Sequence, residues 1–214
     1  RLLNAALGET VLVIGLGLLG LISIQLLRTS GVRVVGLDPD AGKVSLARKL
    51  GIDAAFRDEA DVREFIGEVT DGSGADAVII LASTPSHRPM EFGAEMARER
   101  AVVAIPGLVG LSVPRQLFYD KELRLIIPHS AGPGIDDIDY EERGLEYPLP
   151  YVRWSARRNL KNILLLMETA KLDLNTLITH RFSINRADQA YEMLNAHKGS
   201  DYVGVLLGFV GIAV

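Results

Sequence analysis

The chain has 214 residues, of which 48% are apolar, so it can bury a substantial core, and a disordered chain is excluded. Its 23 Lys and Arg against 27 Asp and Glu give a formal charge of −4, which offers no basic footprint for nucleic acid. The absence of cysteine excludes disulfides and thiolate zinc sites within these residues and suits a reducing cytoplasm. Because the apolar runs are broken too early to span a bilayer, we expect a cytoplasmic protein with no signal peptide and no membrane partner.

Strand-like apolar runs alternate with helical patterns over the first 128 residues. The expected strands are 10–14, 32–37, 54–56, 77–81, 102–105 and 123–127, and the expected helices are 18–27, 41–50, 62–69 and 90–97. Short links with glycine, such as Gly31 and Gly51 directly after helices, indicate right-handed crossovers. The sequence therefore predicts an α/β fold of the Rossmann type, with a doubly wound, parallel, six-stranded sheet and a C-terminal helical extension.

The alternation of strand-like and helical patterns stops after residue 128, where the expected dinucleotide-binding core (1–128) ends. Residues 129–150 contain six acids and a single basic Arg143, and we expect an acidic loop insertion that is either a solvated segment or a lid or partner surface. Residues 151–214 are assigned to the same domain, with helices over 155–172 and 186–194 and a return strand. The apolar run 203–214 is expected to be buried, against its own sheet or in a homodimer, the alternative being a frayed tail.

A glycine motif follows the first expected strand and opens the first helix. In Gly15-Leu16-Gly17-Leu18-Leu19-Gly20, Gly15 would permit a tight turn, Gly17 would let a pyrophosphate reach the backbone, and Gly20 would let helix and strand approach closely. The N–H groups at the start of the helix, including those of Leu18 and Leu19, would then face the phosphates. The alternative is that the glycines serve packing alone.

The second expected strand ends in Asp38, 18 residues after Gly20. An acid there can accept hydrogen bonds from the ribose 2′- and 3′-hydroxyls and would repel a 2′-phosphate, so the sequence favours NAD as cofactor. No arginine follows immediately to neutralise it. Alternatively, Asp38 is the N-cap of the next helix, and Lys43 is either a ribose contact or a solvated helix residue.

The ends of the fourth and fifth expected strands should complete the site, since ligands bind beyond the carboxyl ends of strands in open sheets. The small residues there, Ala82 and Ser83 with Ile105 and Pro106, would let the nicotinamide half of the cofactor pass, the alternative being plain strand-to-helix turns. The four histidines are far apart in sequence, so no metal site is expected, and the catalytic residues stay unknown. His129, at the end of the sixth strand, is more simply a hydrogen-bonded histidine.

Several stretches resemble the coenzyme domain of medium-chain, zinc-type alcohol dehydrogenase-like proteins. These are residues 11–20, Asp38 with Lys43, 48–51, 74–78 and 102–107, and the segments 177–182 and 187–192 are similar to that family's return into its catalytic domain. The resemblance covers most of residues 1–206. It implies a Rossmann domain that presents nicotinamide to a substrate, while the family's N-terminal catalytic domain with its zinc ligands is absent from this chain.

A narrower resemblance concerns residues 118–123, 130–134, 139–144 and 151–154. They are similar to two-domain oxidoreductases whose second half is glucose-fructose-oxidoreductase-like. The leading hypothesis is thus the NAD(H)-binding part of an oxidoreductase acting on a small-molecule alcohol or sugar-derived substrate, with this chain alone inactive. The alternatives are a non-catalytic NAD(H)-binding or sensing module and, less favoured, a class I methyltransferase.

Overall fold

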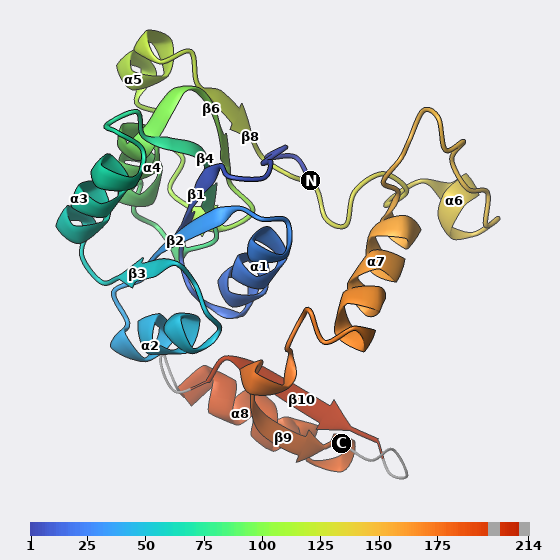
Figure 1. The fold of residues 1–214 in the computed structure, drawn as a ribbon. Coiled ribbons are helices and arrows are strands. Elements are labelled where there is room, and N and C mark those ends of the chain that lie inside the picture. Colours follow the sequence, from blue (N-terminus) through green and yellow to red (C-terminus); the bar gives the residue numbers. More distant parts are fainter. Residues whose placement is uncertain (197–201, 210–214) are drawn as a thin grey trace.

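The computed structural model describes residues 1–196 and 202–209. Its centre is the parallel, six-stranded sheet that the sequence predicted (Figure 1), and the strands follow one another in the order β3-β2-β1-β4-β6-β8. The order reverses between β1 and β4, which is where ligands bind in doubly wound sheets. The strands are β1 (Thr10–Ile14), β2 (Arg33–Leu37), β3 (Ala54–Phe56), β4 (Ala75–Ile80), β6 (Ala97–Ala104) and β8 (Arg124–Ile126).

Helices cover both faces of this sheet. They are α1 (Leu18–Thr29), α2 (Ala41–Lys49), α3 (Glu59–Val69), α4 (Arg88–Met96) and α5 (Arg115–Asp120). Alternate residues of β1 point to opposite faces: Val11 and Val13 pack in the cluster that includes residues of α1 and α2, and Leu12 and Ile14 pack in the cluster that includes residues of α3 and α4. Because both faces are covered, the strands are nearly continuous apolar runs, which made them readable in the sequence.

Glycines end the first two helices where the sequence placed them. Gly31 and Gly51 follow the C-caps of α1 and α2 with φ of +77° and +80°, in the left-handed region that favours glycine. A two-stranded parallel sheet, β5 (Ser83–Thr84) with β7 (Leu108–Val109), sits beyond the ends of β4 and β6 and was not predicted. It joins the two turns that follow these strands.

The acidic segment is an ordered loop with one short helix, α6 (Ile138–Glu141). Asp137 caps this helix by accepting the backbone N–H groups of Asp139 and Tyr140, and it also accepts a short hydrogen bond from the hydroxyl of Tyr147, which lowers the pKa of Asp137. Arg158 donates to the carbonyl of Tyr147 at 2.7 Å. Figure 1 shows the loop projecting away from the sheet, and none of residues 129–150 is found among those lining the cleft described below.

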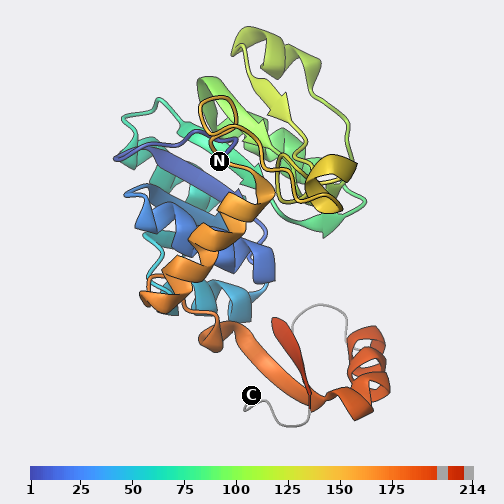
Figure 2. The ribbon, with the colours of Figure 1, turned by 90° about the vertical axis from the view of Figure 1, so that its right-hand side faces the viewer.

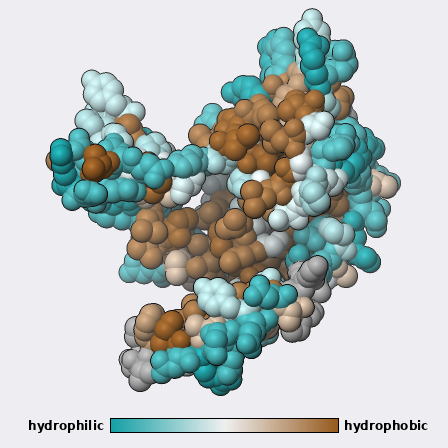
Figure 3. All heavy atoms as spheres, turned by 180° about the vertical axis from the view of Figure 1, so that it is seen from behind, coloured by the Kyte–Doolittle hydropathy of each residue, from teal (hydrophilic) through white to brown (hydrophobic). Residues whose placement is uncertain are grey.

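Helix α7 (Ala156–Glu168) is shorter than expected and buries none of its residues. It ends before Ala170, which has a φ of +53° that a helix cannot continue through. Leu160 and Leu164 of the predicted apolar face are 62% and 55% exposed. Seen from behind, apolar residues gather over a broad area between the α6 loop and the C-terminal elements (Figure 3).

The C-terminal elements form a separate sheet. β9 (Ile178–Ser183) pairs in parallel with β10 (Gly204–Gly208), and α8 (Ala187–Ala196) lies between them in the chain (Figure 2). The amide of Gln25 on α1 holds the segment before β9, since it donates to the carbonyl of Asp173 at 3.0 Å and accepts its N–H at 2.7 Å. The expected burial of residues 203–214 is met in part: β10 pairs with β9 but is mostly half-buried, Phe209 is exposed, and residues 210–214 lie outside the described part.

Candidate functional site

A cleft of about 770 Å³ lies at the carboxyl ends of β1, β2 and β4. Tyr202 and Val203 line it from the segment before β10, so residues far apart in sequence contribute to one site. The residues that line it are Ile14, Gly15, Gly17, Leu18, Leu37, Asp38, Pro39, Lys43, Arg57, Glu59, Leu81, Ala82, Ser83, Thr84, Ser86, Arg88, Pro89, Phe92, Tyr202 and Val203.

Each glycine of the motif has its own steric reason. Gly15 has a φ of +97°, and a Cβ there would lie 2.6 Å from the backbone nitrogen of Ala82. A Cβ at Gly20 would lie 2.1 Å from the carbonyl oxygen of Gly15, so only glycine lets α1 start so close to the turn. Gly17 differs, because it has a φ of −69° and a Cβ there would meet nothing within 4 Å. The fold therefore does not require glycine at position 17. Glycine is required there only if a ligand is to reach the backbone from the cleft.

The start of α1 presents its backbone to the cleft. The helix begins at Leu18, and the first bond that closes its initial turn runs from the N–H of Leu21 to the carbonyl of Gly17 at 2.9 Å. The N–H groups before Leu21 have no carbonyl within the helix to bond. The first turn, which the structure describes completely, holds no acidic side chain. Leu18 lines the cleft, whereas Leu19 is exposed and Gly20 lies behind the turn, so neither lines it.

Asp38 is fixed in the cleft by backbone donors, with only 6% of its surface exposed. One carboxylate oxygen accepts the N–H of Leu16 at 2.8 Å, and the other accepts the N–H of Asp40 at 2.9 Å. The alternative role as N-cap is wrong: Asp40 caps α2 by accepting from Gly42 and Lys43. Because each carboxylate oxygen has a second lone pair, Asp38 keeps acceptor capacity for two hydroxyls. Lys43 lies 3.9 Å from it.

The ends of β4 and β6 lie against each other behind the glycine turn. Ala82 and Ser83 line the cleft; Ile105 and Pro106 do not, Ile105 being buried and Pro106 exposed on the next turn. A Cβ at Gly107 would lie 2.4 Å from the carbonyl oxygen of Ala82. The peptide of Ala82 is therefore held between Gly15 and Gly107, in backbone contact on both sides.

Sequence analysis named Lys43 but missed Arg57 and Arg88, two further basic residues that line the cleft. Arg57 follows β3 and donates through Nε to the carbonyl of Pro39 at 3.1 Å, directly after Asp38. The signal for Arg57 was available, because the ends of the second and third strands are neighbours in a doubly wound sheet. Arg88 and Glu59 come from the starts of α4 and α3, and no sequence pattern indicated them.

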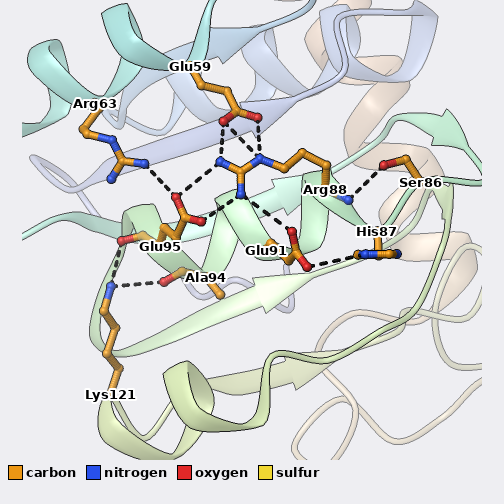
Figure 4. Close-up of polar contacts among 9 residues, drawn as sticks. All are labelled: Glu59, Arg63, Ser86, His87, Arg88, Glu91, Ala94, Glu95 and Lys121. Atoms are coloured by element: carbon orange, nitrogen blue, oxygen red, sulfur yellow. Dashed lines mark hydrogen bonds and ion pairs between the residues drawn. The ribbon is translucent and has the colours of Figure 1, made fainter.

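Arg88 is the centre of an ion-pair network with Glu59, Arg63, Glu91 and Glu95, which we call the Arg88 network (Figure 4). Its guanidinium donates to Glu59 through Nε and Nη2 and to Glu95 through Nη1 at 2.8 Å. These bonds raise the pKa of Arg88, and the hydrogen bond from Arg88 lowers the pKa of Glu95. Since its donors are committed to carboxylates, Arg88 shapes the cleft and ties α3 to α4.

A second polar cluster closes the other end of α4. The Nζ of Lys121 donates to the carbonyls of Ala94, Glu95 and Ala97 at 3.1, 2.7 and 2.8 Å (Figure 4 shows the first two). These are carbonyls at the end of the helix that have no helical partner, so Lys121 satisfies them and offsets the negative end of the helix dipole. Burial lowers the pKa of Lys121.

The histidines that the structure describes are dispersed. His87 lies 3.5 Å from Glu91, His129 lies 3.5 Å from Asp136, and His180 contacts the hydroxyl of Thr179 at 3.0 Å. Among the described residues, no group of three or more His, Cys, Asp and Glu is placed to hold a metal ion. No helix in residues 1–196 or 202–209 is long and apolar enough to cross a membrane.

The site fits a dinucleotide in three independent respects. The open Cβ position of Gly17 leaves room for a phosphate against the backbone, the N-terminus of α1 offers unpaired N–H groups, and Asp38 offers acceptors one strand away. A family profile described as "Zinc-binding dehydrogenase" matches residues 19–130, just over half of the chain. The chain belongs to the zinc-binding dehydrogenase family.

Proteins that resemble the chain include dehydrogenases and oxidoreductases. The sorbitol dehydrogenase of Halalkalibacterium halodurans is 27% identical over 206 residues, which are 94% of this chain and 52% of that protein. An alcohol dehydrogenase of Escherichia coli CFT073, solved with NADH, has a TM-score of 0.72 at 21% identity. The match covers 97% of this chain and 54% of that protein. The mycobacterial protein Rv1454c, solved with NADPH, has a TM-score of 0.67 at 20% identity. The match covers 97% of this chain and 59% of that protein. The chain thus spans about half the length of the proteins it matches.

Proposed function

We propose that this chain is the NAD(H)-binding part of an oxidoreductase acting on a small-molecule alcohol or sugar-derived substrate. The observation that carries the proposal is the doubly anchored carboxylate of Asp38, which lies in the same cleft as the open backbone of Gly17. A carboxylate held there favours two ribose hydroxyls over a 2′-phosphate. The family of the chain and the sorbitol dehydrogenase relative support the class of reaction.

In this proposal each residue of the cleft has a binding role. The N–H groups at the start of α1 bind the pyrophosphate, and Asp38 accepts hydrogen bonds from the ribose, with Lys43 3.9 Å from its carboxylate. Ala82 and Ser83 border the path toward the nicotinamide end. The nicotinamide, when bound, supplies hydride transfer. In this proposal, the residues that handle the substrate's hydroxyl proton correspond to the part of the sorbitol dehydrogenase that this chain does not cover, since the match spans 52% of that protein.

A titration tests the proposal. The chain is titrated with NADH, NADPH and S-adenosylmethionine while cofactor fluorescence or heat is measured, with Gly17→Val as the matched control. We expect NADH to bind most tightly and the variant to lose it. Saturable binding of S-adenosylmethionine alone would support a class I methyltransferase instead, and NADPH binding as tight as NADH would contradict the selectivity assigned to Asp38.

A second candidate is a module that binds or senses NAD(H) without catalysis. One observation favours it: in the described part of the chain, no histidine lines the cleft, and the two carboxylates that line it, Asp38 and Glu59, each pair with a cation. The two candidates share the cofactor and differ in turnover. Oxidation of an alcohol or sugar by the full-length protein would exclude the second.

We also propose the finer kinship with two-domain oxidoreductases whose second half is glucose-fructose-oxidoreductase-like. It is supported by the resemblance of residues 118–123, 130–134, 139–144 and 151–154. The reading frame around these residues tests it, because such a half should follow residue 214. A cytoplasmic location is proposed as well, supported by the cysteine-free sequence, and a homodimer, supported by the exposed apolar surface.

A further inference from the structure

The charges of the described residues that line the cleft do not cancel. Among residues 1–196 and 202–209, the lining carboxylates are Asp38 and Glu59, and the lining cations are Lys43, Arg57 and Arg88. Lys43 pairs with Asp38 at 3.9 Å, and Arg88 pairs with Glu59. Arg57 is thus the lining cation for which no carboxylate partner is found in the described part of the chain.

The pairing of β2 with β3 puts Arg57 beside Asp38. Leu37 is opposite Phe56, and the N–H of Asp38 donates to the carbonyl of Phe56 at 3.2 Å, so the residues that follow are neighbours across the sheet edge. The Nε of Arg57 donates to the carbonyl of Pro39, which anchors the guanidinium at that place. Its two Nη groups have no partner among residues 1–196 and 202–209, so they can donate to a ligand.

This cation stands on the ribose side of the cleft. The glycine turn after β1 and the start of α1 receive the pyrophosphate in the proposed function. Asp38 follows the neighbouring strand β2, and Arg57 follows β3, the strand beyond β2. We propose that Arg57 forms a phosphate subsite beside the adenosine ribose, so that Arg57 and Asp38 together decide between NAD(H) and NADP(H). The inference rests on the proposed function, since it needs a dinucleotide in the cleft.

In the wild-type protein the two residues oppose each other. The carboxylate of Asp38 is almost buried and is locked by the N–H groups of Leu16 and Asp40, so it cannot turn away from a 2′-phosphate. Arg57 offers the paired donors that suit a phosphate. Removing the charge of Asp38 should therefore suffice to admit NADP(H). The sequence has no arginine immediately after Asp38, but the structure brings Arg57 beside it.

The test compares four proteins: wild type, Asp38→Asn, Asp38→Asn with Arg57→Gln, and Asp38→Asn with Arg48→Gln. Arg48 is the matched control, because it also donates to one backbone carbonyl, that of Ala55 at 2.7 Å, but does not line the cleft. Dissociation constants for NADH and NADPH are measured by fluorescence, and those for 2′,5′-ADP and 5′-AMP by calorimetry. We expect Asp38→Asn to strengthen NADPH and 2′,5′-ADP binding about tenfold, Arg57→Gln to cancel the gain, and Arg48→Gln to leave it.

Two results would overturn the inference. One is an equal NADPH affinity of Asp38→Asn with and without Arg57→Gln. If the Asp38 variants do not fold, Arg57→Gln in the wild-type chain replaces them. This variant should weaken NADPH binding several-fold and leave NADH binding unchanged. An equal effect on the binding of both cofactors is the second result that would overturn the inference. Wild type that binds no NADH would overturn the proposed function itself, whereas NADH binding without any effect of Arg57 would overturn only this subsite.

Discussion

The carboxylate of Asp38, at the end of β2, accepts a hydrogen bond of 2.8 Å from the backbone N–H of Leu16, in the turn after β1. The residue proposed to recognise the ribose therefore also holds the glycine turn in place. Recognition and local folding depend on one side chain, and the N–H of Leu16 would be left in an almost buried position without its acceptor if that side chain were removed.

Asp38→Ala should consequently affect two measurements at once. We expect the free energy of unfolding to fall by about 1–3 kcal/mol, and NADH affinity to be lost, because the ribose acceptors and the turn are removed together. Asp40→Ala is the control: it removes only the N-cap of α2, which costs about 1 kcal/mol, and should keep NADH binding. Denaturant unfolding and fluorescence titration check this, and an Asp38→Ala protein of wild-type stability would contradict the dual role.

Gly17 and Gly20 should respond differently to the same substitution. Gly17→Val should abolish NADH binding with little change in the melting temperature, since a Cβ there meets nothing in the protein but enters the space of the pyrophosphate. Gly20→Val should lower the free energy of unfolding by about 3 kcal/mol or more, because a Cβ lies 2.1 Å from the carbonyl of Gly15. Thermal unfolding and titration separate the two, and NADH binding by Gly17→Val would refute the phosphate turn.

The Arg88 network should make stability depend on pH below neutrality. The hydrogen bond from Arg88, with a further one from Arg63, lowers the pKa of Glu95 below its usual value of 4.5. Its contribution is thus complete above pH 4.5 and is lost as the pH falls through the lowered pKa. Glu95→Gln should cost about 1 kcal/mol at pH 7 and progressively less as the pH falls through the lowered pKa. Glu68→Gln, an exposed change on α3, should cost nothing at any pH in this range, and a pH-independent loss in Glu95→Gln would exclude the electrostatic cause.

The purified 214-residue chain should bind NADH without oxidising simple alcohols or sugars. The reason is its side chains: it has no cysteine, and the histidines that the structure describes stand outside the cleft. Absorbance at the NADH band, with and without added zinc, is the measurement. Zinc-dependent turnover that persists after His129 and His180 are replaced would show that this expectation is wrong.

Self-association should depend on the C-terminal run. The half-buried strand β10 and the exposed Phe209 give this run apolar surface that association can bury. Sedimentation of the 214-residue chain beside one truncated after Tyr202 tests this, with a dimer expected for the longer chain and a monomer for the shorter. Monomers in both cases would remove the homodimer proposal.

The sheet was predictable because each strand carries its own signal. Buried β-branched runs such as 11–14 require covered faces, and the glycines after helices mark where the chain must take a positive φ. The cleft was predictable as far as it depends on the ends of strands that follow each other in order, as Gly15 and Asp38 do. Arg88 was not, because nothing in its neighbouring sequence indicates that its carboxylate partners on α3 and α4 converge.

The C-terminal part was less predictable for a different physical reason. The apolar face of α7 predicted burial, yet Leu160 and Leu164 are exposed, because amphipathic periodicity reports that a helix needs a partner surface and not where that surface is. The pairing of β9 with β10 joins residues about 25 positions apart outside the main sheet, and the alternation of strands and helices gives no sign of a second sheet. Short strands that are half-buried carry little apolar signal.

The peptide of Ala82, held between Gly15 and Gly107, has a consequence for how the length of this region can vary in evolution. Three turns from three different strands meet there through main chain alone, so no change of side chain can make room for an extra residue in any one of them. Insertions and deletions should therefore be selected against at these turns, whatever residues occupy them. Diversification of the cleft is left to its margins, such as the turn after β3, where the side chain of Arg57 reaches the carbonyl of Pro39.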